Sequence, residues 1–236
     1  MTHAFGGEME DLKRAAAHEA VERYVEAGMV LGLGSGTTAS WAVRRIGELL
    51  AGGKLRDVRG IPTSEHTAAL AWEAGVPLVS LADARPDLTI DGADEIDADF
   101  NVIKGLGGAL LREKIVAASS RDGLVIVADG SKLVGAVGNG PLPVEVEPFG
   151  WEATLDALAS LGCEPELRLV ETQPFVTDGG HYTIDCLFSG IPDPAALEVE
   201  IKRIPGALEC GLFVGLARAA VVSRGEAEGG TEVIEP

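Results

Sequence analysis

The stretch Met29-Val30-Leu31-Gly32-Leu33-Gly34-Ser35-Gly36-Thr37-Thr38 joins an apolar run to a glycine-rich turn and then to a helical pattern. Met29–Leu33 is short and continuously apolar, as expected of a strand buried on both faces. Thr37–Leu50 then has helical periodicity and ends before Gly52-Gly53. A buried strand followed directly by a helix predicts a parallel sheet that is covered by helices.

The same alternation continues on both sides of this stretch. Helical patterns occupy Glu10–Ala27, Glu65–Ala74 and Leu110–Ser119. Short apolar runs predict strands at Val58–Ile61, Leu78–Leu81, Leu88–Ile90 and Leu124–Ala128. Alternating strands and helices predict an α/β fold with a Rossmann-like, mostly parallel sheet and helices on both faces.

The pattern changes after a Gly/Pro-rich link at Gly135–Pro143. The expected order there is strand, helix, strand, strand, helix, strand, which is the split βαβ of a small α+β ferredoxin-like domain. The expected elements are Val144–Glu147, Trp151–Leu161, Glu166–Val170, Phe175–Thr177 in a hairpin with Tyr182–Leu187, Pro194–Ile204 and Leu208–Phe213. We expect strands Ala219–Ser223 and Glu232–Ile234 to return to the first domain. The predicted domains are 1–138 with 208–236, and 139–207.

Composition excludes several classes of protein. The chain has 236 residues, 46% of them hydrophobic, and a formal net charge of -18. So acidic a chain disfavours nucleic acid and anionic membranes as partners. No apolar run approaches the roughly 20 residues of a membrane span, and the first residues have no signal-peptide pattern. Three cysteines, without a Cys-x-x-Cys pair, predict small buried side chains in a reducing compartment, so we expect a cytoplasmic protein.

The glycine-rich turn Gly32–Thr38 is the first candidate for ligand binding. Backbone N–H groups at the start of a helix, with the hydroxyls of Ser35, Thr37 and Thr38, can hold a phosphate. A dinucleotide site would need glycine at Thr37, and a Walker loop would need Gly-Lys-Ser/Thr. The alternative is an ordinary strand-to-helix turn with a capping hydroxyl.

Acidic residues follow the strand that ends at Ile90. The run Asp91–Asp99 either forms a solvated acidic turn or places Asp91 and Asp94 where they accept hydrogen bonds from sugar hydroxyls. The second interpretation rests on position, because ligands of open parallel sheets bind at the carboxyl ends of strands. The spacing does not fit a calcium loop.

Two further motifs place cations near glycines. Lys104-Gly105-Leu106-Gly107-Gly108 leads into a helix that carries Glu113, and Ala128–Lys132 ends an apolar strand. Each has a plain alternative, a surface charge triplet at Arg112–Lys114 and a simple turn at Lys132. Apolar flanks around Glu113 leave little room for a wide solvated face and instead favour a side chain that points into a cleft. No paired metal spacing exists among the four histidines, His3, His18, His66 and His181.

Taken together, these motifs resemble the type A ribose-5-phosphate isomerases. The matching stretches are Gly32–Thr38, Asp91–Glu95, Lys104–Gly108 with Arg112-Glu113-Lys114, Ala128–Lys132 and Pro141–Val146. Three residues depart from the usual family pattern: Ser35 replaces threonine, Leu106 replaces glycine, and Gly130 replaces alanine. None of these changes removes a catalytic group.

The resemblance implies interconversion of ribose 5-phosphate and ribulose 5-phosphate, without cofactor or metal, in a homodimer or homotetramer. It implies Glu113 as the base, assisted by Asp91 and Lys104, and a carboxylate base is expected to be largely buried beside apolar neighbours. The substrate-binding residues that it implies are Lys13, Ser35, Gly36, Thr37, Thr38, Asp91, Gly92, Ala93, Asp94, Lys104, Gly105, Leu106, Gly107 and Lys132.

Three other functions fit parts of the pattern. An amino-sugar-phosphate deaminase would favour a histidine within the motifs, and none of the four lies there. A sugar-phosphate sensor of a transcription regulator would carry a basic DNA-binding module, in contrast to this acidic chain. An NAD-dependent oxidoreductase would need an acid after the second strand, where the chain has Gly60-Ile61-Pro62.

Overall fold

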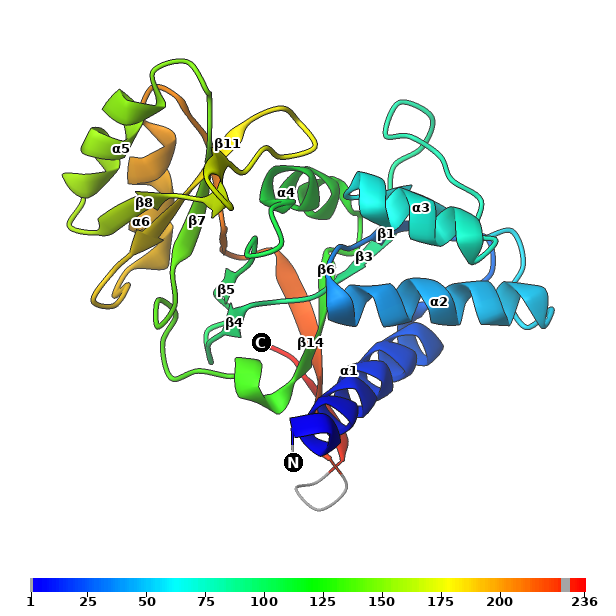
Figure 1. Ribbon diagram of the computed structural model, residues 1–236. Coiled ribbons are helices and arrows are strands. Elements are labelled where there is room, and N and C mark those ends of the chain that lie inside the picture. Colours follow the sequence, from blue (N-terminus) through cyan, green and yellow to red (C-terminus); the bar gives the residue numbers. More distant parts are fainter. Residues whose placement is uncertain (1, 226–229) are drawn as a thin grey trace. The chain divides into compact units, whose positions relative to one another are not determined.

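A computed structural model describes residues 2–225 and 230–236 as two compact units (Figure 1). Unit 1 takes its described residues from 1–93, 112–132 and 216–236, and unit 2 comprises 94–111 and 133–215. The predicted domain boundaries at 138/139 and 207/208 stay a prediction, because a compact unit need not be an independently folding domain.

Unit 1 is built on a six-stranded sheet in the order β15-β14-β6-β3-β1-β2. The strands are β1 (Val30–Leu33), β2 (Arg59–Pro62), β3 (Leu88–Asp91), β6 (Leu124–Asp129), β14 (Ala217–Ser223) and β15 (Thr231–Ile234). The neighbours from β2 to β14 pair in parallel, and β15 pairs antiparallel with β14. β14 runs beside β6 in Figure 1, so the predicted return of the tail to the first sheet is confirmed.

Helices cover both faces of this sheet, as predicted. The helices are α1 (Thr2–Tyr24), α2 (Thr37–Ala51), α3 (Glu65–Glu73) and α4 (Leu110–Ser119), of which residues 112–119 belong to unit 1. Buried side chains of α1, α2 and α3 share one core with the alternate strand residues Leu31, Leu33, Leu88 and Ile90. Val116 of α4 packs instead with Val30 and Ile61, which point to the other face.

Two expectations about unit 1 are wrong in detail. α1 begins at Thr2 rather than Glu10, because Gly6-Gly7 weakens the local helical signal ahead of an otherwise helical segment. The predicted strand Leu78–Leu81 does not form; only Leu78 makes a bridge, to Gly60. Leu78 and Leu81 are 37% and 39% exposed, and only the partly buried Val79 packs against the core, so little holds this run at the sheet edge as a strand. Among the described helices, none combines the length and apolar character needed to cross a membrane.

Unit 2 contains the predicted β-α-β-β-α-β order. Its four-stranded sheet has the order β12-β7-β11-β8, and all neighbours are antiparallel. The elements are β7 (Leu142–Val146), α5 (Trp151–Ala159), β8 (Glu164–Leu167), β11 (Tyr182–Leu187), α6 (Pro194–Lys202) and β12 (Ala207–Cys210). Residues of both helices and all four strands form one core, which includes the three cysteines as buried, unbridged side chains. The prediction of small buried cysteines is therefore confirmed.

The hairpin expected within unit 2 is mostly wrong. β11 pairs along its length with β7 and β8, whereas the segment Phe175–Thr177 contributes a single bridge, between Val176 and Tyr182. Val176 is 55% exposed, so it gains little from joining the sheet. A short hairpin forms earlier instead, between β9 (Leu169–Val170) and β10 (Gln173–Pro174).

A small sheet in unit 2 was not predicted from the sequence. It joins β4 (Glu95–Ile96), β5 (Val102–Ile103) and β13 (Leu212–Phe213) by antiparallel pairing. These two-residue strands are too short to show a periodic pattern. A single turn of 3-10 helix, η1 (Gly130–Lys132), follows β6 in unit 1.

Candidate active site

The connections of the unit 1 sheet reverse direction between β1 and β3. β1 continues through α2 to β2 on one side, while β3 leads through α4 to β6 on the other side. Ligands of open α/β sheets bind at the carboxyl ends of the strands at such a switch point. The glycine-rich turn follows β1 and the Asp91 motif ends β3, so two of the predicted motifs meet at this point.

Asp91 is buried and holds the two loops together. The residue as a whole is only 1% exposed. Oδ1 accepts hydrogen bonds from the backbone N–H groups of Ser35 at 3.1 Å and Gly92 at 2.7 Å. A Cβ at Gly34 would lie 2.2 Å from the same oxygen, so glycine is required for the approach of β1 to this carboxylate. The alternative of a solvated acidic turn is therefore wrong for Asp91.

The hydroxyl of Ser35 points into a cluster of other hydroxyls. Its Oγ lies 2.8 Å from Thr63 Oγ1, donates to Ser64 Oγ at 2.8 Å and lies 3.1 Å from Thr67 Oγ1. Ser64 also caps α3, since its Oγ accepts the N–H of Thr67 at 3.0 Å. The sequence carried no signal for the contact between Ser35 and this cap, because the two residues are 29 positions apart. Ser35 therefore fixes the shape of the loop, and its direct contact with substrate stays a prediction.

The start of α2 supplies the groups that suit a phosphate. Gly36 is the N-cap residue with φ 93°, and as a glycine it has no side chain of its own to cap the N–H groups that follow. Thr37 is exposed and Thr38 is half-buried. A Cβ placed on Gly92 would lie 4.0 Å from the side chain of Thr38, so the loops after β1 and β3 are adjacent. Open N–H groups at the positive end of a helix favour an anionic ligand.

Glu113 lies in the part of α4 nearest the carboxyl ends of the strands. The other end of the helix lies beside residues that precede β3, because the N–H of Arg121 donates to the carbonyl of Pro86 at 3.1 Å. Glu113 and Val116 are three residues apart and share a helix face, and Val116 Cγ1 lies 2.7 Å from the position of a Cβ on Gly32 of β1. The Glu113 face of α4 is therefore turned toward the sheet.

Glu113 and Lys114 are both buried, whereas Arg112 beside them is not. Glu113 is 4% exposed, which confirms the predicted burial. Arg112 is only partly buried and its Nη1 donates to Glu65 Oε1 at 2.8 Å. The alternative of a surface triplet is therefore wrong for Glu113, whose carboxylate is shielded from bulk water.

The two other candidate lysines of unit 1, Lys132 and Lys13, are less buried than Glu113. Lys132 is half-buried in η1, just after Asp129, which accepts the N–H of Ser131 at 3.0 Å. Lys13 is half-buried in α1 and donates to Glu10 at 2.9 Å. This hydrogen bond is the main cause of a lowered pKa of the Glu10 carboxyl. Contacts of both lysines with a phosphate stay a prediction.

Unit 2 holds the second group of predicted residues. Asp94 Oδ2 accepts the N–H of Leu106 at 3.0 Å, so the acidic motif and the glycine-rich loop 104–108 are joined within this unit. Lys104 is 3% exposed, and its Nζ lies 5.6 Å from the centre of the Phe213 ring. The positive φ of Gly105, 109°, explains a glycine at that position. Leu106, the departure from the family pattern, is 47% exposed and so fits without repacking.

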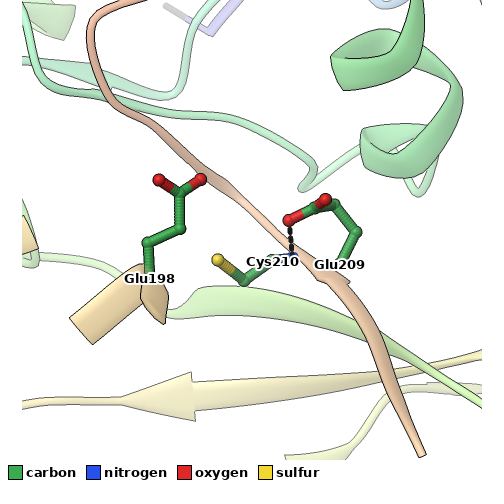
Figure 2. Close-up of side chains that lie close together, drawn as sticks. All are labelled: Glu198, Glu209 and Cys210. Atoms are coloured by element: carbon green, nitrogen blue, oxygen red, sulfur yellow. Dashed lines mark hydrogen bonds between the residues drawn. The ribbon is translucent and has the colours of Figure 1, made fainter. Parts of the chain in front are cut away.

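One group of side chains in the described residues has the spacing of a metal site. The ligand atoms of Glu198, Glu209 and Cys210 lie within 4.8 Å of one another (Figure 2). However, Glu209 Oε2 accepts from Lys202 Nζ at 2.8 Å, and Oε1 accepts the N–H of Cys210 at 3.0 Å. The carboxylate is thus already neutralised, and the group ties β12 to α6.

Comparisons with known proteins agree with this architecture. The family model described as Ribose 5-phosphate isomerase A (phosphoriboisomerase A) matches residues 59–227. Ribose-5-phosphate isomerase A of Gloeobacter violaceus is 55% identical over 232 residues, 97% of this chain and 98% of that protein. The chain is thus an isomerase of the α/β class.

Solved structures extend the similarity to three dimensions. Ribose 5-phosphate isomerase from Plasmodium falciparum matches with a TM-score of 0.92 and 38% identity, covering 97% of this chain and 99% of that one. A D-ribose-5-phosphate isomerase in complex with phospho-erythronic acid matches with a TM-score of 0.92 and 36% identity over the same shares. The chain belongs to the ribose 5-phosphate isomerase A family, as its motifs predicted. Membership favours the isomerase over the deaminase, the sensor domain and the oxidoreductase.

Proposed function

We propose that this protein interconverts ribose 5-phosphate and ribulose 5-phosphate in the non-oxidative pentose phosphate pathway, by moving a proton between C2 and C1. The observation that carries the proposal is the burial of Glu113 on the face of α4 that is turned toward the sheet. A carboxylate shielded from water is suited to take a weakly acidic proton from carbon. Family membership gives the substrate class, a phosphorylated pentose.

Glu113 is the base in this proposal. Its carboxylate takes the proton from C2 of the open-chain aldose, and the electron pair of the C–H bond moves to give a cis-enediolate. The same group, now protonated, returns the proton to C1, while the oxygen on C1 gains a proton and the oxygen on C2 loses one. The product is the ketose, with no net change in atoms or charge.

The oxygen that becomes negative needs hydrogen-bond donors. We assign this task to Lys104 and to the backbone N–H groups of Gly105 and Gly107, because the N–H of Leu106 already donates to Asp94 Oδ2 at 3.0 Å. Lys104 is almost fully buried, and buried donors act more strongly on a developing charge than exposed ones. Removal of one such donor in other enzymes lowers turnover by about 10²- to 10³-fold.

The acidic motif is assigned to the sugar hydroxyls. Asp91 moves the hydroxyl proton between the oxygens and helps to open the furanose ring, and Gly92, Ala93 and Asp94 line the sugar. The Oδ1 atom of Asp91 already accepts two backbone N–H groups, which fixes the orientation of the carboxylate. A fixed carboxylate can hold a hydroxyl without reorganising during the reaction.

The phosphate is assigned to the start of α2 with two lysines. Gly36, Thr37 and Thr38 present N–H groups and hydroxyls, and Lys13 and Lys132 supply positive charge in a chain that is otherwise strongly acidic. Ser35 supports this loop through its hydroxyl cluster. Phosphate binding remote from the reacting carbons helps to position the sugar.

Several properties follow from this assignment. The reaction moves a proton within one molecule, so it needs no redox cofactor. In this assignment Lys104 and the loop N–H groups, in place of a metal ion, stabilise the negative oxygen. The net charge of -18 fits a protein that binds neither nucleic acid nor an anionic membrane. In line with the resemblance, we propose a cytoplasmic homodimer or homotetramer.

The base is tested by Glu113→Gln. This change preserves size and removes the basic group, so turnover should fall by about 10²- to 10⁴-fold or more while substrate binding changes little. A coupled assay for ribulose 5-phosphate and an isothermal titration with ribose 5-phosphate measure the two effects. Glu145→Gln is the matched control, because Glu145 is 2% exposed, its Oε1 accepts from Thr177 at 2.9 Å, and it is not among the residues to which we assign substrate contact.

Two outcomes would reject the assignment. If Glu113→Gln turns over at the wild-type rate, Glu113 is not the base. If Glu113→Gln and Glu145→Gln lose the same activity, burial of a neutral amide explains the loss.

Lys132→Ala should mainly raise KM, because a phosphate anchor binds ground state and transition state alike. A loss confined to kcat would contradict the anchoring role.

A further inference from the structure

A single arginine of unit 2 holds the glycine-rich loop that follows Lys104. Arg168, which lies between β8 and β9, donates from Nη1 to the carbonyl oxygens of Gly105 at 3.1 Å and Leu106 at 3.0 Å. The residue is 63 positions from Gly105 in the sequence and belongs to none of the motifs. One donor group thus binds two successive peptide carbonyls of the loop.

Other side chains fix the guanidinium in place. Its Nε donates to Asp185 Oδ2 at 2.7 Å, and its Nη2 donates to Asp185 Oδ1. Both partners are largely buried, with side chains 14% and 24% exposed. Phe175 lies under the guanidinium, with 5.7 Å between Cζ and the ring centre. A paired and stacked arginine of this kind has few other orientations open to it.

Phe175 also limits the far end of the loop. A Cβ on Gly108 would lie 2.3 Å from Cζ of this ring, so the backbone of Gly108 packs directly on the aromatic side chain. The N–H of Gly108 donates to the carbonyl of Gly105 at 2.9 Å, which closes the loop as a turn. Arg168 and Phe175 together therefore restrain the loop at two places.

The two carbonyl contacts determine where the loop's N–H groups point. In a planar trans peptide the N–H points opposite to the C=O of the same unit. The carbonyl of Gly105 faces Arg168, and the N–H of Leu106 accordingly points away and donates to Asp94. By the same geometry the carbonyl of Leu106 directs the N–H of Gly107 away from the guanidinium. Both N–H groups therefore point away from the guanidinium, to the side on which the N–H of Leu106 already binds a carboxylate.

We propose that Arg168 is a positioning residue, which aims the N–H of Gly107 at the oxygen that becomes negative during isomerisation. The inference rests on the proposed function, in which this loop stabilises the enediolate. Arg168 itself touches no reacting atom. It acts by preventing rotation of the two peptide units, so that the donor is oriented before the charge develops.

Lysine cannot replace arginine in this role. The guanidinium binds Asp185 with two nitrogens and still reaches two carbonyls with the Nη1 group. An ammonium is a single point of charge without the planar fork, so it cannot keep the carboxylate and both carbonyls in one fixed geometry. Arg168→Lys should therefore behave more like Arg168→Ala than like the wild type.

Lys202→Ala is a matched control within the same unit. Lys202 Nζ also donates to a carboxylate, that of Glu209 (Figure 2), at 2.8 Å, and to a backbone carbonyl, that of Leu208, at 2.7 Å. It makes the same kinds of bond as Arg168 but serves β12 and not the loop. The control therefore reports the effect of losing an ion pair of unit 2 by itself.

The test measures kcat and KM for ribose 5-phosphate in the wild type, Arg168→Ala, Arg168→Lys and Lys202→Ala. Hydrogen exchange of the amides of residues 104–108 is followed in the same four proteins. We expect both Arg168 variants to lose about 10- to 10³-fold in kcat, up to the effect of one lost oxyanion donor, with a much smaller change in KM. Exchange in the loop should accelerate in these variants and stay at the wild-type rate in Lys202→Ala.

The possible results separate this inference from the proposed function. A wild-type protein that forms no ribulose 5-phosphate rejects the function and the inference with it. An active wild type with Arg168 variants of unchanged kcat rejects the inference alone, as does a loss of kcat without faster exchange in the loop. If Arg168→Ala does not fold, Arg168→Lys and Asp185→Asn, which retain most of the packing, decide in its place.

Discussion

Substitution of Gly34 by alanine tests the junction between β1 and β3 most directly. The added Cβ would lie 2.2 Å from Oδ1, 2.3 Å from Cγ and 2.6 Å from Cα of Asp91. Ordinary van der Waals contact begins at 3.4 Å, so the carboxylate or the turn has to move by about 1.2 Å. One of the three atoms belongs to the backbone, so rotation of the Asp91 side chain cannot relieve the whole overlap.

The expected magnitudes follow from this displacement. Overpacking of a close-packed interior lowers the unfolding free energy by about 1–3 kcal/mol. For a chain of this length, that corresponds to a fall in Tm of about 2–12 °C. If Asp91 handles the hydroxyl proton, a displacement near 1 Å should also lower kcat/KM by about 10²-fold.

Thermal unfolding and the ribulose 5-phosphate assay provide the two readouts. Gly135→Ala is the control, because a Cβ there meets nothing within 4 Å and the residue does not need a positive φ. A Gly34→Ala protein with the Tm and the activity of the control would refute the steric reasoning. A lowered Tm with full activity would instead remove Asp91 from the reaction.

Three further changes probe stability elsewhere in the chain. Burial, followed by the charge of Arg45, lowers the pKa of His18 below its usual 6.5, so the neutral form is favoured in the folded state. Stability from His18 is therefore present above pH 6.5 and lost as the pH falls through the folded pKa. Urea unfolding of the wild type and of His18→Gln, measured above pH 6.5 and well below it, should show this loss in the wild type alone. The same pH dependence in both proteins would contradict the reasoning. Ser64→Ala removes the cap of α3 and should lower the unfolding free energy by about 1 kcal/mol, whereas Ser64→Asp should retain most of it. In the wild type the N–H groups of Gly138 and Gly140 each donate to the Glu95 carboxylate at 2.7 Å. Glu95→Gln places an amide donor against these N–H groups and should lower the unfolding free energy by about 1–3 kcal/mol. A variant with wild-type stability would show that these bonds contribute nothing net.

The local pattern of side chains was sufficient to predict most of the fold. Continuous apolar runs gave β1, β3 and β6, because a strand buried on both faces has no polar alternation. The alternation with helical periods predicted the parallel sheet, and the order of elements after Gly135 predicted the ferredoxin-like sheet. The burial of Glu113 was expected from the role that the resemblance implies, and Val116, three residues further along the helix, is buried on the same face.

Partners that are distant in the sequence could not be predicted in the same way. The choice of β8 over the segment 175–177 as the neighbour of β11, and the sheet of β4, β5 and β13, depend on which backbones the topology brings together. The same is true of the Ser35 hydroxyl cluster and of the contact between Arg168 and Gly105. Periodicity along a chain specifies the type of each element and its buried face, whereas hydrogen-bond partners are specified only when the packed elements fix the direction of each side chain. The sequence by itself thus determined the fold class and the family, and the tertiary structure decided how the loops of the candidate site are held.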